Sequence, residues 1–247
     1  MKSFLLGFLL LSAAALAQNE IPPGTILPAQ LNSSLNSRKI TAGQTFTARI
    51  MQDVPLSPHT KIRAGSKVVG RVVSVNAAEK GGSSQITLRF DRLEFHHRSV
   101  PISTNLRALA SAMEVEDAQV PPAGPDRGTP WAWITRNLIG GQVAYGAGGP
   151  VARGDSIVGK ALADGVLLLV EANPARGCRG QMAGNKGDQA LWVFSSDACR
   201  LYGMPDITLA HAGRSEPVGE ITLTSNQGNL NVRAGSGLLL RIESAKQ

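Results

Sequence analysis

Four histidines are the first residues whose chemistry could define a site, because imidazole binds metal ions and transfers protons near neutral pH. His96 and His97 are adjacent, and His59 and His211 are the other two. Successive side chains on a strand point to opposite faces, so a strand through His96 and His97 would keep the two rings from sharing one ion. We therefore expect surface or strand-end histidines and no metal site.

A second group of residues has the types found in a serine nucleophile triad. Ser156 follows Gly154-Asp155, and Asp206 and His211 supply an acid and a base further along the chain. No G-x-S-x-G elbow surrounds the serine, and these three residue types are common. We expect a protein that is not an enzyme, with no catalytic residue and no cofactor, and we keep a secreted serine hydrolase as the weakest alternative.

Trp131 and Trp133 are two residues apart, which on a strand places both rings on one face. Such a pair suits a platform for a sugar ring, so a secreted glycan-binding module is the main alternative function. The competing interpretation is that both rings fill the core. Glycines 140–149 lack the GK[ST] ending of a phosphate loop, and no interleaving of basic and aromatic residues predicts nucleic-acid binding.

The N-terminus has the three parts of a cleavable secretory signal. Lys2 is followed by an apolar run over residues 4–11 and then by small residues that include Ala15 and Ala17. The run is too short for a membrane-spanning helix, which needs about 20 apolar residues. We expect residues 1–17 to be a signal peptide, no transmembrane helix after its cleavage, and a periplasmic or secreted protein, with outer-membrane association included.

The chain has two cysteines, Cys178 and Cys199, and both follow the predicted signal. An exported pair meets an oxidising environment, so we expect a disulfide between them. It would close a loop of roughly 20 residues and contribute about 3 kcal/mol by restricting the unfolded chain. No CxxC pattern or nearby histidine pair completes a metal site.

Composition favours a folded, mainly β protein. The 247 residues are 43% hydrophobic and 17% charged, with 27 Gly and 14 Pro. Many turns that join short strands account for such a composition. The formal net charge is +7, but Lys and Arg are scattered along the sequence and form no run. We therefore interpret them as ordinary surface charge.

The clearest local prediction is a β-hairpin from residues 62–75 and 85–95, separated by Gly81-Gly82-Ser83-Ser84. The second strand alternates apolar with polar residues, so one of its faces is buried. Residues 98–103 predict another short strand, and residues 106–113 have a helix-forming composition. Further strands are expected at 45–50, 207–209 and 219–224.

Residues 121–130 hold four prolines and two glycines, which predicts a loop and an internal boundary. This divides the mature chain into an N-terminal barrel-like half, 18–120, and a C-terminal β-rich half, 131–247, that carries the disulfide. The overall expectation is a modified β-barrel or sandwich with a short helical and glycine-rich middle segment. Arg233-Ala234-Gly235-Ser236 repeats Arg63-Ala64-Gly65-Ser66, which predicts the same turn at two places in one sheet.

Three segments near the N-terminus carry a resemblance to a known family: IPPGTILPAQL at 21–31, AGQTFTAR at 42–49 and IRAGSKVVG at 62–70. Their order resembles the TrbI-like family, which supplies the β-barrel subunit of the type IV secretion channel. The resemblance extends over about residues 21–105, and residues 232–242 are loosely similar to the closing strand of that family. Members of the family typically have an inner-membrane helix and a Pro-rich linker before the barrel, where this chain has the predicted signal.

The resemblance implies a barrel or sandwich in the cell envelope whose role is scaffolding or binding. We therefore expect an exported, non-enzymatic envelope protein with a structural or assembly role. Its expected partners are itself or other envelope proteins, a glycan in the alternative function, and no nucleic acid. Fold similarity alone does not transfer function, so this role is an expectation.

Overall fold

A computed structural model describes residues 21–57, 59–119, 135–139, 142–145, 151–153, 156–162, 165–168, 191–194 and 198–244. The predicted signal peptide, the loop at 121–130, Trp131, Trp133 and Cys178 lie outside these residues. The protein is mainly β, as the composition predicts, and its described part has one short helix, α1 (Ala112–Gln119). Within the described residues, no helix has the length and apolar character needed to cross a membrane.

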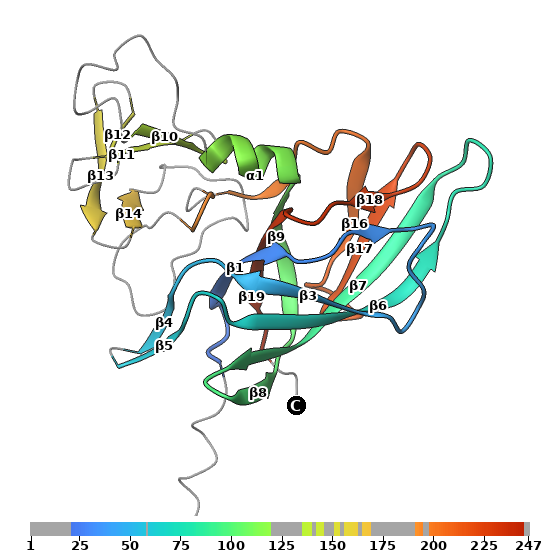
Figure 1. Ribbon diagram of the computed structural model, residues 1–247, viewed down its shortest axis with the longest axis horizontal. Coiled ribbons are helices and arrows are strands. Elements are labelled where there is room, and N and C mark those ends of the chain that lie inside the picture. Colours follow the sequence, from blue (N-terminus) through green and yellow to red (C-terminus); the bar gives the residue numbers. More distant parts are fainter. Residues whose placement is uncertain are drawn as a thin grey trace, which may run out of the picture.

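One large sheet dominates the described structure (Figure 1). Its strands are β1 (Ile26–Leu31), β3 (Thr45–Ile50), β6 (Lys67–Asn76), β7 (Ser84–Phe95), β8 (Arg98–Pro101), β9 (Thr104–Ala110), β15 (Arg200–Tyr202), β16 (Ile207–Ala212), β17 (Glu220–Ser225) and β19 (Gly237–Ile242). The smaller pairings join β2 (Leu35–Asn36) to β18 (Asn231–Val232) and β4 (Val54–Ser57) to β5 (Thr60–Ile62). Others join β10 (Thr135–Leu138) to β11 (Gln142–Tyr145), and β12 (Val151–Arg153), β13 (Ser156–Leu162) and β14 (Gly165–Leu168) to one another.

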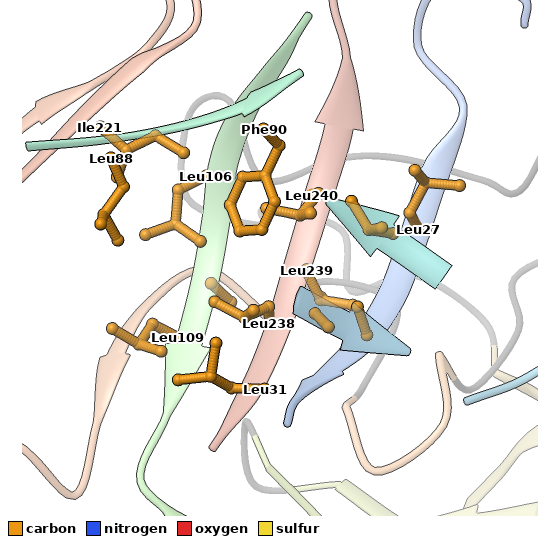
Figure 2. Packing of buried hydrophobic residues seen from close by; sticks show 14 of the residues in the cluster. Leu27, Leu31, Leu88, Phe90, Leu106, Leu109, Ile221, Leu238, Leu239 and Leu240 are labelled. Atoms are coloured by element: carbon orange, nitrogen blue, oxygen red, sulfur yellow. The ribbon is translucent and has the colours of Figure 1, made fainter. Parts of the chain in front are cut away.

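The large sheet runs in the order β15-β9-β19-β1-β3-β6-β7-β17-β16, and β8 pairs with the C-terminal part of β7, from Arg92 to Phe95. It therefore combines strands from both sides of the 121–130 loop. The sheet is curled, because β9 near one end and β17 near the other line the same apolar interior. Figure 2 shows Leu88 of β7 and Ile221 of β17 beside Leu106 of β9. Among the described strands no ladder joins β16 to β9 or β15, so the curl is not closed.

The half of the sheet formed by β6, β7 and β17 is covered on one face only. Along β17 the side chains of Ile221 and Leu223 are buried and alternate with half-exposed Thr222 and Thr224. This period of two is the pattern of a strand with one face in a core and the other toward solvent. On the inner face the Phe46 and Phe90 rings meet edge to face, 5.3 Å apart at 77°. Gly70 of β6 lies against this pair: an added Cβ would be 2.5 Å from the Phe46 ring.

The other half of the sheet, β1, β9 and β19, is covered on both faces. All seven residues of β9 are buried. The second cover comes from α1 and from residues 191–194, because a Cβ on Gly237 of β19 would meet Val115 at 2.9 Å and Phe194 at 3.1 Å. This burial corrects one prediction: residues 106–110, expected to begin a helix, form β9, and the helix starts at Ala112. Pairing with both β19 and β15 overrides the local helix propensity.

Four glycine turns fix the ends of the central strands, and each has the same hydrogen bonds. In each, the fourth N–H donates to the first carbonyl at 3.1 or 3.2 Å, and the glycine in third place has φ between 83° and 88°. These are the features of a type II turn, which requires a positive φ at that place. The turns are 22–25 before β1, 41–44 before β3, 63–66 before β6 and 233–236 before β19.

Each turn also binds the end of a neighbouring strand. The Gly65 N–H donates to the Ile50 carbonyl at 2.7 Å, and the Ile50 N–H donates to the Ser66 carbonyl at 2.8 Å. Gly235 and Ser236 form the same two bonds with Leu31, both at 2.9 Å. The turn at 22–25 binds Ile242 in this way, and the turn at 41–44 binds Val72. The pairs β1–β19 and β3–β6 are therefore equivalent units, so the repeated Arg-Ala-Gly-Ser segment does mark a structural repeat.

Candidate functional site

An open hollow of about 700 Å³ lies on the protein surface between two tight turns. One wall is formed by residues 63–67, which are the type II turn and the start of β6. The other wall is formed by residues 94–99, where β7 turns into β8. The two walls meet because β6 and β7 are antiparallel partners, with Lys67 opposite Glu94.

The first wall is held in place by a carboxylate. Oδ1 of Asp53 accepts the Ala64 N–H at 2.9 Å, and Oδ2 forms an ion pair with Nζ of Lys61 at 2.5 Å. The hydrogen bond from Lys61, followed by the one from the Ala64 backbone, lowers the pKa of Asp53. Asp53 therefore stays ionised at neutral pH and holds the turn in place through the Ala64 N–H.

The second wall contains the adjacent histidines, which lie exposed at the end of β7, as expected for surface or strand-end residues. Phe95 pairs with Arg98, so His96 and His97 are the two central residues of a tight hairpin turn. Their φ angles are 48° and 58°, and two positive φ values in succession are the mark of a type I′ turn. Histidine is one of the side chains that adopt this conformation more often than most, but each such residue still costs about 1 kcal/mol or more.

Contacts with neighbouring segments hold this strained turn. The His96 ring donates from Nε2 to the Lys61 carbonyl at 3.1 Å, which ties the turn to β5. The same ring meets the Phe95 ring edge to face, with centroids 5.5 Å apart. His97 is exposed at the tip of the hairpin. Both imidazoles therefore stand at the edge of the hollow rather than in a core.

The charge of the hollow is positive. Three cationic side chains, Arg63, Lys67 and Arg98, line it together with one carboxylate, Glu94. That carboxylate binds Nζ of Lys67 at 2.7 Å and Nε of Arg92 at 3.2 Å. The hydrogen bond from Lys67 is the main cause of the lowered pKa of Glu94. With neutral imidazoles the lining has a net charge of +2, from three positive groups and one negative group.

This basic surface is not visible in the sequence, because its Lys and Arg residues form no run there. Arg63 and Lys67 precede Arg98 by about thirty positions, and only the pairing of β6 with β7 brings them together. One available signal was the pair of histidines between an aromatic and an arginine, at the end of a predicted strand. A two-residue turn at that place would bring the two histidines and the arginine to the same edge of the sheet.

His211 has a partner that differs from the one considered from the sequence. Its Nδ1 lies 2.6 Å from the main-chain carbonyl of Glu220, and its Nε2 lies 3.0 Å from Oγ of Ser215. The short contact to a carbonyl requires a proton on Nδ1, which leaves Nε2 to accept from the serine hydroxyl. The Gly213 N–H, 3.1 Å from Nδ1, then faces a donor and forms no hydrogen bond with it. These bonds fix the loop between β16 and β17.

Other predicted site residues fall in different places. Trp131 and Trp133 lie outside the described residues, as does the side chain of Ser156. Cys199 is described and has no free thiol, whereas Cys178 is not described, so their pairing stays a prediction. His59 is exposed. In the described ranges no three His, Cys, Asp or Glu side chains are grouped closely enough to hold a metal ion.

The interior of the curled sheet leaves a gap of only about 10 Å³ among its apolar side chains. A single water molecule needs about that much space, so this gap does not hold a larger ligand. No protein-family model matches the chain, and no curated protein matches it. The basic hollow is therefore identified from its geometry and charge alone.

Proposed function

We propose that this chain is an exported, non-enzymatic component of the cell envelope with a structural or assembly role, built on a TrbI-like barrel. The predicted signal peptide and the resemblance of residues 21–105 support the location and the class. In this proposal the protein works in the periplasm or beyond it, and Cys178 pairs with Cys199 in that oxidising space. Its partners are further copies of itself or other envelope proteins.

The packed interior is one observation that favours assembly over ligand storage. Barrels that carry small molecules keep a cavity inside the sheet. Here Leu31, Phe90, Leu109 and Leu238 fill that space, and the gap that remains is about 10 Å³. Binding to partners is therefore proposed at the outer surface and at the edges of the sheet.

The observation that carries the proposal is the edge strand β16. It pairs with β17 on one side, and no other described strand pairs with it. Its six residues, Ile207–Ala212, contain no charged side chain and no proline, which are two common means of protecting an edge. A bulge lies between Leu209 and His211, and the strand approaches β9 and β15 without pairing with either of them. A strand of this kind is suited to pairing with a strand from another chain.

The simplest assembly pairs β16 with β16 of a second copy, antiparallel across a twofold axis, so that two sheets become continuous. A photo-crosslinking amino acid at Thr208, an exposed residue of β16, tests this in producing cells. We expect a crosslinked species of twice the chain mass. The same amino acid at exposed Lys80, in the turn between β6 and β7, is the control and should give no such species.

Size-exclusion chromatography with light scattering provides the second measurement. The exported chain should contain a dimer or a larger species, and Thr208→Lys should convert it to monomer, because a lysine on an edge strand opposes strand pairing. Unchanged circular dichroism would show that this variant is folded. A monomeric wild-type chain, together with no crosslink from Thr208 to a second copy or to an envelope protein, would reject the assembly role.

A further inference from the structure

We propose that the hollow between residues 63–67 and 94–99 is a binding site for a phosphate group. The proposal depends on the side chains of the hollow and not on the assembly role of β16. Its first support is charge complementarity: the lining has a net charge of +2, and a phosphate monoester or a pair of phosphodiesters has the matching negative charge.

The second support is that the nearby carboxylates are already occupied. Asp53 is bound by Lys61 and by the Ala64 N–H, and Glu94 is bound by Lys67 and Arg92. The Arg63 guanidinium lies close enough to Asp53 to lower the pKa of that carboxyl, but it forms no hydrogen bond or ion pair with any described residue. An anion from solution therefore does not have to displace a protein carboxylate from this guanidinium.

The third support is the type of donor present. Arg63 carries a planar guanidinium group, and such a group binds two oxygens of one phosphate at once. Ser66 and Ser99 also line the hollow, and their hydroxyls can donate to the remaining oxygens. Phosphate has enough acceptor oxygens for several of these donors, whereas a single carboxylate has two.

The size and openness of the hollow indicate a phosphate attached to something larger. A volume of about 700 Å³ exceeds what an inorganic phosphate fills, and it matches a headgroup or another small phosphorylated molecule. The half-buried Phe95 ring adds an apolar surface for the carrier of the phosphate. A phosphate in a lipid headgroup and a phosphate on a soluble molecule share this chemistry, so the test has one arm for each source.

The soluble arm titrates the full exported chain with inorganic pyrophosphate at 0.15 M salt and follows binding by calorimetry. The membrane arm measures co-sedimentation with vesicles of phosphatidylglycerol and phosphatidylcholine, compared with phosphatidylcholine alone. Binding in the soluble arm assigns a soluble phosphate ligand. Binding to the anionic vesicles only assigns a lipid headgroup.

The variant Arg63→Glu should weaken binding about tenfold or more in the arm that responds, because a charge-assisted hydrogen bond is lost and a repulsive charge is added. The repeated turn supplies a matched control. Arg233→Glu makes the same change in charge at the equivalent residue of the turn 233–236, which does not line the hollow. Binding of this control should stay within about twofold of wild type, as expected for a distant surface charge.

Two outcomes would overturn the proposal. Absence of binding in both arms is one of them. Equal weakening by Arg63→Glu and Arg233→Glu is the other, because it would mean that the anion responds to the overall charge of the protein and not to the hollow.

Discussion

The two Arg-Ala-Gly-Ser turns show how one local structure can have different surroundings. Both have a glycine with φ of 88°, and both bind the end of a neighbouring strand through the same pair of hydrogen bonds. Even the bond to the alanine N–H is repeated: Asp53 accepts it in the first turn, and Oγ of Ser34 accepts it in the second, at 2.9 Å in each. In both units the accepting side chain follows, by three residues, the strand residue that the turn binds: Asp53 follows Ile50, and Ser34 follows Leu31.

The difference lies in what packs around the turns. The turn at 63–66 is open to solvent beside the histidine hairpin, and its capping residue is a carboxylate paired with Lys61. The turn at 233–236 lies next to α1, and a Cβ on Gly235 would be 3.5 Å from that of Ala112. The turn therefore has a structural role in both units, whereas binding chemistry arises only where a second basic segment lies beside it.

The largest loss of stability expected in this comparison comes from glycine-to-alanine substitutions in β6 and β19, the strands that follow the two turns. We expect Gly70→Ala in β6 to lower the free energy of unfolding by about 3 kcal/mol. Its Cβ would be 2.5 Å from the Phe46 ring and 2.7 Å from the Arg89 carbonyl, and a backbone atom cannot move aside easily. Gly237→Ala in β19 should cost about 1 kcal/mol, because it meets only the side chains of Val115 and Phe194.

Urea denaturation of the two variants measures this difference. The ranking would be contradicted if Gly237→Ala proved as costly as Gly70→Ala. That result would mean that the doubly covered half of the sheet is packed more rigidly than the half with one exposed face.

A smaller effect is expected from the glycines of the turns themselves. Gly65→Ala and Gly235→Ala should each cost about 1 kcal/mol, since alanine is strained at a φ of 88°. No atom lies within 4 Å of the added Cβ at Gly65, and only an ordinary contact exists at Gly235. The two costs should therefore agree to within about 0.5 kcal/mol in chemical denaturation. A larger difference would show that the surroundings, and not φ, decide the cost.

The smallest loss of stability is expected from replacing Asp53 and Ser34, the two side chains that accept the alanine N–H of each turn. Asp53→Ala and Ser34→Ala should each cost about 1 kcal/mol or less at pH 7, because each removes one hydrogen bond to an exposed turn, and the ion pair with Lys61 that Asp53→Ala also removes is exposed to solvent. Asp53 has a pKa lowered by Lys61 and the Ala64 backbone, so its contribution is present above its unfolded pKa. That contribution is lost as the pH falls through the lowered folded pKa, below about pH 4.

Denaturation curves at pH 7 and pH 3 test this sign. The cost of Asp53→Ala should be smaller at pH 3 than at pH 7, while the cost of Ser34→Ala should stay the same, since a hydroxyl does not titrate in this range. A cost of Asp53→Ala that does not change with pH would mean that the hydrogen bond geometry, rather than the charge, stabilises the turn.

Much of the fold was predictable because short-range patterns specify it. Alternation over residues 85–95 predicts a strand with one buried face, and β7 spans Ser84–Phe95. The repeated Arg-Ala-Gly-Ser segment predicts a repeated turn, since only glycine adopts its positive φ without strain. The helix expected at 106–113 was wrong for its first part, because burial between β19 and β15 outweighs the propensity of Leu and Ala.

The candidate site was far less predictable. The strand-end position of the two histidines was expected, but the two-residue turn that places both rings at one edge of the hollow was not. The signal peptide, the disulfide and the tryptophan platform stay predictions from the sequence, since the residues that would test them lie outside the described part of the chain.

By itself the sequence determined the mainly β class, the hairpin of β6 and β7 and the repeated glycine turn, because period-two alternation and positive-φ glycines act over a few residues. Tertiary structure alone decided that β9 is a strand covered on both faces and that Arg63, Lys67 and Arg98 surround one hollow. Both outcomes depend on the pairing of strands that are distant in the sequence: β6 pairs with β7 across about thirty positions, and β9 pairs with β19 across more than a hundred.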